Sequence, residues 1–189
     1  MRAKAVRWYP FLLYATLLTC CALVLLLAQE NRQLEKRLYQ ASLAAAGGPE
    51  ISAQLSDIAV TELDGVDSTL VLGNAEQESV MLVFTTSCPA CQQNVEPWLD
   101  LHRRFGEHYE FTAVSLDPLV ATHIYAEANE LPYRVVIPKD RSAFQESLNI
   151  KKVPQTLVVD AAGRVKIVQP GVLSEEFREQ LAADNIAAR

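Results

Sequence analysis

The sequence predicts an α/β fold, a mixed sheet flanked by helices, behind one N-terminal transmembrane helix. Three observations lead to this prediction. Residues 8–29 carry no charged side chain. From about residue 56 onward, short runs rich in Val and Ile alternate with segments of helical pattern, as in sheets covered by helices. Near the C-terminus, two such runs are separated only by Ala161-Ala162-Gly163, which predicts a pair of antiparallel strands.

The N-terminal segment is expected to be a membrane anchor at residues 8–28, after a short tail at residues 1–7. The uncharged stretch has 22 residues, and as a helix it would be about 33 Å long, enough for the hydrocarbon core of a bilayer. A cleaved signal peptide would need a better small-x-small exit, and a lipoprotein signal a smaller residue than Thr19 before Cys20. In an uncleaved anchor, Cys20 and Cys21 face lipid or a packed helix; acylation or a cross-linked dimer is the alternative.

The charges that flank the anchor predict its orientation. Three basic residues and the α-amino group precede it, and Arg32, Lys36 and Arg37 follow it. The positive-inside rule then favours a short tail inside and a long C-terminal part outside. We therefore expect a single-pass protein of the cytoplasmic membrane with its folded domain on the periplasmic side.

Residues 29–55 are expected to form a polar, helix-prone stalk and linker, and residues 56–189 the folded domain. Residues 50–189 contain 11 Lys and Arg against 21 Asp and Glu, a net charge of −10. A surface of this sign repels phosphate backbones, so we expect no nucleic-acid partner.

The elements of the domain are expected in a regular order. A hairpin at 58–72 turns at Asp64-Gly65, and the continuous apolar run at 80–84 is typical of a central strand covered on both faces. A helix follows at 88–105, kinked by Pro97. The remaining elements are strands at 109–116, 133–137, 155–160 and 164–169, and helices at 121–130, 141–148 and 174–183.

Two cysteines, Cys88 and Cys91, stand three positions apart after the central strand. Such a pair can be half of a zinc site, a structural staple or a reacting pair. A structural zinc site needs a second pair of ligands, and His102, His108 and His123 do not form one at the required spacing. A disulfide that closes so short a loop restrains little of the unfolded chain. The sequence therefore predicts a reacting pair and no metal.

The predicted position of Cys88, at the N-terminus of a helix, supports this reading. Unpaired backbone N–H groups and the helix dipole favour a negative charge there, so they promote loss of the thiol proton. Pro89 suits the first helical turn, where no N–H partner is needed. Cys91 is one turn further on and less exposed. We expect Cys88 to attack and Cys91 to resolve.

The arrangement strand, Cys-x-x-Cys and helix, followed by "KKVPQTLVVDAAGRVK" about sixty residues later, resembles the thioredoxin fold. With its anchor and leading hairpin, the chain is similar over about residues 56–185 to membrane-tethered thiol–disulfide oxidoreductases of the TlpA/ResA type, in the AhpC/TSA-related superfamily. Val153 and Pro154 match the family's cis-proline loop, which faces the active cysteines and pairs with the substrate chain. The resemblance thus implies Val153 and Pro154 as substrate-binding residues and no cofactor.

The chain departs from the family pattern near the cysteines. Leu82 stands where thioredoxins carry a buried acid, and Asn94 stands where the TlpA/ResA kind often has a glutamate. The proton acceptor for Cys91 is therefore unassigned, with water or a group of the partner as stand-ins. Trp98 is expected to pack in the core, and the three histidines to be solvated helix residues.

These features together predict an enzyme, a thiol–disulfide oxidoreductase that acts as a reductant of protein disulfides. Its partners would be disulfide-bearing client proteins, a membrane-embedded electron donor and, through residues 8–28, the lipid bilayer. A peroxiredoxin-like thiol peroxidase is the alternative, because Thr85 matches part of that pattern, although Met81 stands where its proline belongs. A copper-chaperone binding module, with His123 as a loose candidate ligand, is a minor alternative.

Overall fold

One long helix, α1 (Tyr9–Ala46), contains the apolar N-terminal segment. The structure is a computed structural model, and it describes residues 9–72 and 77–187. Within α1, Leu12–Leu34 is long and apolar enough to cross a membrane, and none of this stretch is buried. Cys20 and Cys21 are exposed on it. The helix continues without a break beyond the expected end of the anchor at residue 28.

The C-terminal unit, Leu43–Arg189, is built on a seven-stranded sheet in the described part of the chain. Its strands are β1 (Ile58–Glu62), β2 (Asp67–Leu70), β3 (Ser79–Phe84), β4 (Glu110–Ser115), β5 (Arg134–Pro138), β6 (Gln155–Val159) and β7 (Val165–Pro170). They lie in the order β2-β1-β5-β4-β3-β6-β7. Strands β3, β4 and β5 are parallel, and the other pairs are antiparallel. This mixed sheet confirms the predicted fold class.

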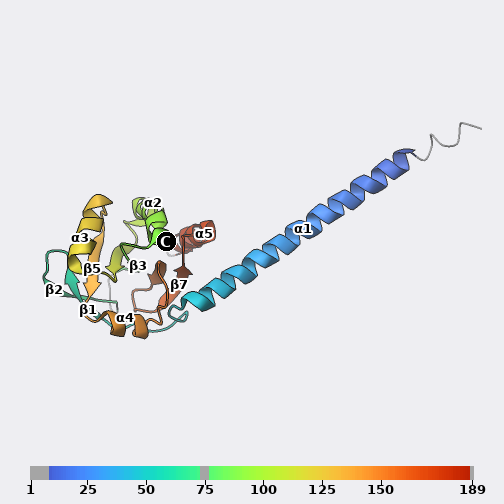
Figure 1. The fold of residues 1–189 in the computed structure, drawn as a ribbon. Helices are drawn as coiled ribbons and strands as arrows, with labels where there is room; N and C mark the ends of the chain where they lie inside the picture. The colour runs from blue at the N-terminus through green and yellow to red at the C-terminus, as the bar shows by residue number, and fades with distance from the viewer. Residues whose placement is uncertain (1–8, 73–76, 188–189) are drawn as a thin grey trace, which may run out of the picture. The chain divides into compact units, whose positions relative to one another are not determined.

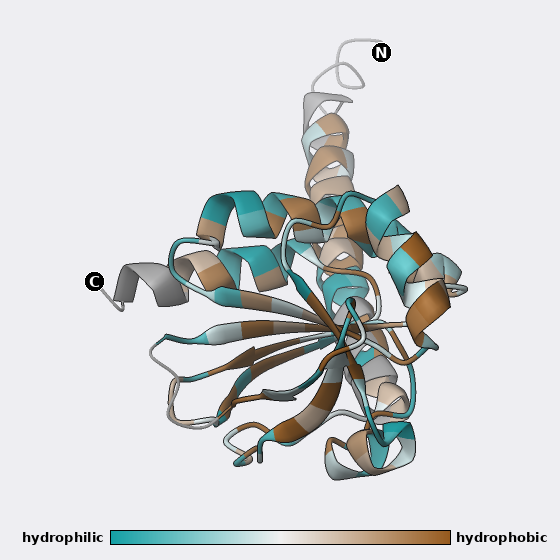
Figure 2. Ribbon diagram, turned by 90° about the vertical axis from the view of Figure 1, so that its left-hand side faces the viewer, coloured by the Kyte–Doolittle hydropathy of each residue, from teal (hydrophilic) through white to brown (hydrophobic). Residues whose placement is uncertain are grey.

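Helices cover both faces of the sheet (Figures 1 and 2). They are α2 (Pro89–Phe105), α3 (Leu119–Ala128), α4 (Arg141–Ser147) and α5 (Glu175–Ala187). Buried side chains of α2, α3 and α5 form one apolar cluster with one face of the sheet, and α4 contributes to the cluster on the other face. Because β3–α2–β4 and β4–α3–β5 are successive parallel crossovers of the same hand, they place α2 and α3 on the same side.

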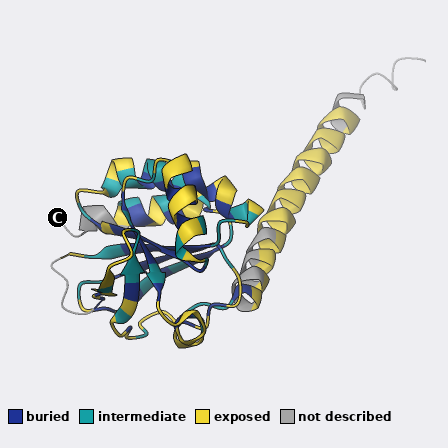
Figure 3. Ribbon diagram, turned by 60° about the vertical axis from the view of Figure 1, so that its left-hand side comes forward, coloured by how far each residue is buried: buried dark blue, intermediate teal, exposed yellow. Residues whose placement is uncertain are grey.

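Strand β3 lies at the centre of the sheet, between parallel β4 and antiparallel β6. All of its residues from Val80 to Phe84 are buried, as the dark strands in Figure 3 illustrate. A strand covered on both faces needs a continuous apolar run, which is why this segment was recognisable. Its carboxyl end lies beside that of β4, since Phe84 pairs with Ser115. The residues that follow both strands therefore meet at one edge.

The two predicted hairpins are present. Between β1 and β2, Gly65 adopts a φ of +85°, and the Asp64 carboxylate accepts a hydrogen bond from the Val66 N–H at 2.9 Å. Between β6 and β7, Gly163 has a φ of +84° and lies against the carbonyl oxygen of Leu72, where a Cβ would be only 2.7 Å away. Both turns thus need the backbone freedom of glycine.

The folded unit begins before the expected boundary at residue 56. The N–H of Gly48 donates to the carbonyl oxygen of Asn149 at 2.8 Å, and the N–H of Lys151 donates to that of Ala46 at 3.0 Å. Leu55 is buried in the core. Part of the segment expected as linker, residues 29–55, therefore belongs to the domain, because its backbone pairs with a loop about a hundred residues later.

Candidate active site

Cys88 lies at the junction between the central strand and α2. Strand β3 ends at Phe84, a short turn follows, and Cys88 is the N-cap residue of α2, with an extended backbone (φ −84°, ψ 118°). Pro89 occupies the first helical turn, and the first helical bond runs from the Gln92 N–H to the Cys88 carbonyl oxygen at 3.1 Å. Cys88 is therefore half-buried at a helix N-terminus, as the sequence predicts.

Cys91 lies one turn further along α2 and is fully buried. It belongs to the apolar cluster that includes Phe84, Val95 and Trp98. Both cysteines are free thiols in this structure. The pair thus combines a sulfur that solvent can reach with one that the core shields.

Burial, with a smaller contribution from the neighbouring Cys88, raises the pKa of the Cys91 thiol to about 12. The backbone and the side chain of Thr85 hydrogen-bond Cys91 and lower its pKa, but they do not offset burial. At neutral pH the shielded sulfur therefore keeps its proton until a reaction demands the thiolate.

The loop before β6 brings Val153 and Pro154 to the cysteines, and the peptide bond between them is cis. The Cys88 Sγ donates a hydrogen bond to the Val153 carbonyl oxygen over 3.8 Å. Pro154 is buried, whereas Val153 is half-buried. All four residues predicted for the site, Cys88, Cys91, Val153 and Pro154, thus gather at the N-terminus of α2.

Asn94, which replaces the family's glutamate, has another role in this chain. Its side chain is fully buried. The amide nitrogen donates to the carbonyl oxygen of Gly171 at 3.0 Å, and the amide oxygen accepts from the Leu173 N–H at 2.8 Å. The N–H of Gly171 in turn donates to the carbonyl oxygen of Pro154 at 2.8 Å. Asn94 therefore ties α2 to the proline loop.

Asp117 holds the turn that precedes Cys88, a role that the sequence analysis did not predict. Its carboxylate accepts from the Thr86 N–H at 2.6 Å and from the Thr86 hydroxyl at 2.7 Å. Ser115 supports Asp117 by accepting from its N–H at 3.2 Å. The strand order could have indicated this contact. Asp117 follows β4, which is parallel to β3, so the carboxyl ends of both strands lie at the same edge of the sheet.

The aromatic and histidine predictions have different outcomes. Trp98 packs in the core as expected, and its indole N–H donates to the Thr156 hydroxyl at 3.0 Å. His102 is not simply solvated, because it is half-buried. The centroid of its ring lies 5.3 Å from that of Phe111 and 5.5 Å from that of Tyr133. His123 remains on the exposed side of α3 beside Glu127.

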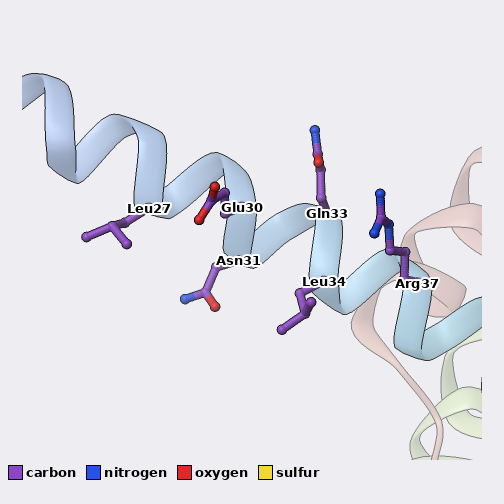
Figure 4. A pocket seen from close by; sticks show the side chains of 6 residues that line it. All are labelled: Leu27, Glu30, Asn31, Gln33, Leu34 and Arg37. Atoms are coloured by element: carbon purple, nitrogen blue, oxygen red, sulfur yellow. The ribbon is translucent and has the colours of Figure 1, made fainter.

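Candidate sites elsewhere in the described residues are weak. Those residues contain no group of three or more His, Cys, Asp and Glu side chains placed to hold a metal ion. A hollow along α1 is lined by Leu27, Glu30, Asn31, Gln33, Leu34 and Arg37. Figure 4 shows that these side chains all project from the same helix. A hollow with walls from one helix does not enclose a small ligand.

The C-terminal unit resembles solved thioredoxin-like structures. The thioredoxin domain of a thiol-disulfide oxidoreductase from Bacteroides vulgatus is 14% identical, with a TM-score of 0.62, over 71% of this chain and 96% of that one. StoA from Bacillus subtilis is 15% identical, with a TM-score of 0.55, over 70% and 98%. A thiol:disulfide interchange protein from Bacteroides sp. is 15% identical, with a TM-score of 0.60, over 70% and 88%. These likenesses confirm the thioredoxin-like fold.

A comparison with curated protein sequences finds no match. The sequence profile of the AhpC/TSA family matches residues 51–168, which is more than half of the chain and includes both cysteines and the proline loop. The predicted family resemblance is thereby confirmed. On this match and on its thioredoxin-like fold, the chain belongs to the AhpC/TSA family.

Proposed function

We propose that this chain is a membrane-tethered thiol–disulfide oxidoreductase that reduces protein disulfides through Cys88 and Cys91. The observation that carries the proposal is the geometry of the pair: Cys88 is accessible at a helix N-terminus and beside the Val153 carbonyl, and Cys91 is buried one turn below. The AhpC/TSA family match supports the proposal, as do thioredoxin-like structures that are named thiol-disulfide oxidoreductases.

The reaction proceeds by two exchanges of sulfur partners. Cys88 attacks one sulfur of a client disulfide as its thiolate, the nucleophilic form of a cysteine. A Cys88–client disulfide forms, and the other client sulfur leaves as a thiolate. Cys91 then loses its proton and attacks Cys88 Sγ, which releases the second client thiolate. The client disulfide is reduced by two electrons, and Cys88 and Cys91 are oxidised to a disulfide.

The loop at Val153 and Pro154 is proposed to bind the client chain next to Cys88. The Val153 carbonyl oxygen lies 3.8 Å from the Cys88 sulfur, and Pro154 in the same loop is buried. An extended client segment that pairs with this backbone would bring its disulfide to Cys88. A bulkier side chain in this loop should therefore weaken binding of the client chain. The reaction of Cys88 with small thiol reagents should stay unchanged.

The reducing direction is proposed from the residues between the cysteines. Pro89 and Ala90 offer no charge and no side-chain hydrogen bond to stabilise the Cys88 thiolate, and less thiolate stabilisation makes a less oxidising disulfide. A membrane-embedded electron donor would then regenerate the dithiol. We expect a potential well below the DsbA value of about −120 mV. A measured potential near that value would assign the opposite direction.

The domain is proposed to face the periplasm, tethered by residues 8–28. The support is the apolar stretch Leu12–Leu34, together with the slight excess of positive charge before it. A membrane-impermeant maleimide should label Cys88 in spheroplasts under reducing conditions. If labelling of reduced protein requires lysis, the domain faces the cytoplasm.

Turnover of insulin disulfides with dithiothreitol tests the activity. The full chain in detergent should accelerate insulin reduction, and Cys88→Ser and Cys91→Ser should each abolish the acceleration. The alternative of a thiol peroxidase predicts instead that the chain consumes hydrogen peroxide with a thiol donor. Thr85, which belongs to that alternative, interacts through its side chain with buried Cys91. Peroxide turnover without insulin reduction would overturn the proposal in favour of the peroxidase.

A further inference from the structure

Gln155 follows Val153 and Pro154 directly and carries a buried amide. It is the first residue of β6 and is fully buried. A glutamine amide offers two N–H donors and one carbonyl acceptor. The acceptor, Oε1, has no hydrogen-bond partner among the described residues, and an apolar side chain would fill this place without that penalty. The donors must therefore account for a polar side chain at this position.

The amide nitrogen of Gln155 closes a ring around Val153 and Pro154. It donates a hydrogen bond to the carbonyl oxygen of Lys152 at 3.1 Å. Lys152 precedes Val153, and Gln155 follows Pro154, so this bond joins the two sides of the loop. The loop carries the Val153 carbonyl oxygen, which lies 3.8 Å from the Cys88 sulfur. The amide thus restrains the backbone beside the proposed attacking sulfur.

The same nitrogen bonds the chain where it leaves α1. It donates to the carbonyl oxygen of Ala46 at 3.1 Å and to that of Gly47 at 3.4 Å. Ala46 is buried and is the last residue of α1. Its carbonyl oxygen also accepts from the N–H groups of Lys151 and Lys152, each at 3.0 Å. Three donors of the loop therefore meet at one carbonyl oxygen of the segment that follows the long helix.

We propose that Gln155 is a positioning residue for the client: its amide fastens the loop of Val153 and Pro154 to Ala46, in the geometry that binds a client chain beside Cys88. The inference deepens the proposed function and rests on it. Among the described residues, the amide of Gln155 bonds backbone carbonyls and neither cysteine. It should therefore affect binding of the client and leave the chemistry of the sulfurs unchanged. The connection from α1 then belongs to the client site.

Gln155→Met removes the amide and keeps an unbranched side chain of similar length. The variant should fold, because the carbonyl oxygen of Ala46 keeps its bonds from Lys151 and Lys152. The unpartnered Oε1 is also removed, which offsets part of the lost bonding. If this variant does not fold, Gln155→Asn replaces it in the test, because it keeps an amide on a side chain one carbon shorter.

Gln54 offers a control on the same connecting segment. Its side-chain nitrogen donates to the carbonyl oxygen of Ala162 at 2.6 Å, across 108 residues, as that of Gln155 reaches Ala46 across 109. Ala162 follows β6 at the end away from Gln155. Although Gln54 is exposed, Gln54→Met removes the same kind of long-range bond, at a place distant along β6 from the client loop.

Insulin reduction at varied insulin concentration separates binding from chemistry. The full chain is used in detergent, with Cys20→Ser and Cys21→Ser in every variant. Gln155→Met should raise KM for insulin by about tenfold, the effect of roughly one hydrogen bond. It should leave unchanged both kcat and the rate at which Cys88 reacts with dithiobis(nitrobenzoate). Gln54→Met should change none of these. A mere loss of folded protein would instead lower kcat and leave KM unchanged.

Hydrogen exchange of the backbone amides reports on the loop without a client. Gln155→Met should speed exchange at Lys151 and Lys152, because one of the bonds that hold Ala46 against the loop is lost. Gln54→Met should leave exchange at these two amides unchanged.

An unchanged KM in Gln155→Met would overturn the inference, and so would an equal rise of KM in Gln54→Met. Failure of the proposed function looks different. A parent chain that leaves insulin disulfides intact would contradict protein-disulfide reduction. Hydrogen exchange then decides the role of Gln155 by itself: faster exchange at Lys151 and Lys152 in Gln155→Met would support its hold on the loop, and unchanged exchange would overturn it.

Discussion

The side-chain amide of Asn94 donates a hydrogen bond to the carbonyl oxygen of Gly171 over 3.0 Å. Its amide oxygen accepts from the Leu173 N–H, and the Gly171 N–H donates to the Pro154 carbonyl oxygen. This chain of bonds joins the helix of the two cysteines to the proline loop. The position that often carries a glutamate in the TlpA/ResA kind thus serves here to hold the two halves of the site together.

Asn94→Ala should destabilise the protein by roughly 2–4 kcal/mol, because it leaves the buried Leu173 N–H and the part-buried Gly171 carbonyl oxygen without their partner. Urea unfolding of the full chain in detergent measures this change by tryptophan fluorescence, with Trp8→Phe in every variant so that the signal comes from Trp98. Gln92→Ala is the control on the same helix: Gln92 is exposed and bonds only the side chain of Asn129 among the described partners. If both substitutions lower the free energy of unfolding by the same amount, the hydrogen bonds of Asn94 contribute no more stability than an exposed side chain does.

Release of the client should accelerate as pH rises. The pKa of Cys91 is raised to about 12 by burial, so its thiolate is a small fraction at neutral pH and grows about tenfold per pH unit between about pH 6 and 9. Decay of an isolated Cys88–glutathione mixed disulfide, measured across this range, should show that slope. A rate independent of pH would mean that a base deprotonates Cys91.

The ion pair between Glu62 of β1 and Arg134 of β5 should make stability depend on acid. A side-chain hydrogen bond from Arg134 lowers the pKa of Glu62 below 4.5. Because the pKa of Glu62 is lower in the folded than in the unfolded protein, its ionisation stabilises the fold. This stabilisation is complete at pH values above the unfolded-state pKa and is lost as pH falls through the folded-state pKa. Both side chains are less than a third exposed, 26% and 29%, and the pair is worth about 0.5–1 kcal/mol.

Glu62→Gln should therefore lower Tm at pH 7 and have little effect near pH 3, values that bracket the ordinary glutamate pKa of about 4.3. Glu96→Gln is the matched control, since Glu96 pairs with Arg103 on the surface and is 77% exposed. If Glu62→Gln is neutral at both pH values, the pair contributes no net stability.

Local patterns were sufficient to predict the elements and the positions of Cys88 and Cys91 in them. The continuous apolar run of β3 is typical of a strand covered on both faces. Pro89, directly after Cys88, suits the first turn of a helix, so the pair indicates a helix start. Each of these signals lies within a few residues. They predicted the fold class and the place of Cys88 at a helix N-terminus because strand burial and helix capping are decided by neighbours in sequence.

Contacts between distant segments could not be predicted in this way. Asp117 is 31 residues from Thr86, and the pairing of Gly47 with Ile150 moves the start of the domain before residue 56. The absence of a glutamate at Asn94 was visible, but its bonds to Gly171 and Leu173 were not. Such roles depend on which loops the sheet brings together, and one sequence gives little information about that.

The assignment of the two sulfurs is the central claim, and trapping of mixed disulfides tests it most directly. Variants of the full chain carry Cys20→Ser and Cys21→Ser with either Cys91→Ser or Cys88→Ser, and are acid-quenched in cells and separated on non-reducing gels. Cys91→Ser should accumulate disulfide-linked client proteins through the accessible Cys88, because no resolving thiol remains. Cys88→Ser should accumulate none, because Cys91 is buried. Client adducts on Cys91 in the Cys88→Ser protein would contradict the account.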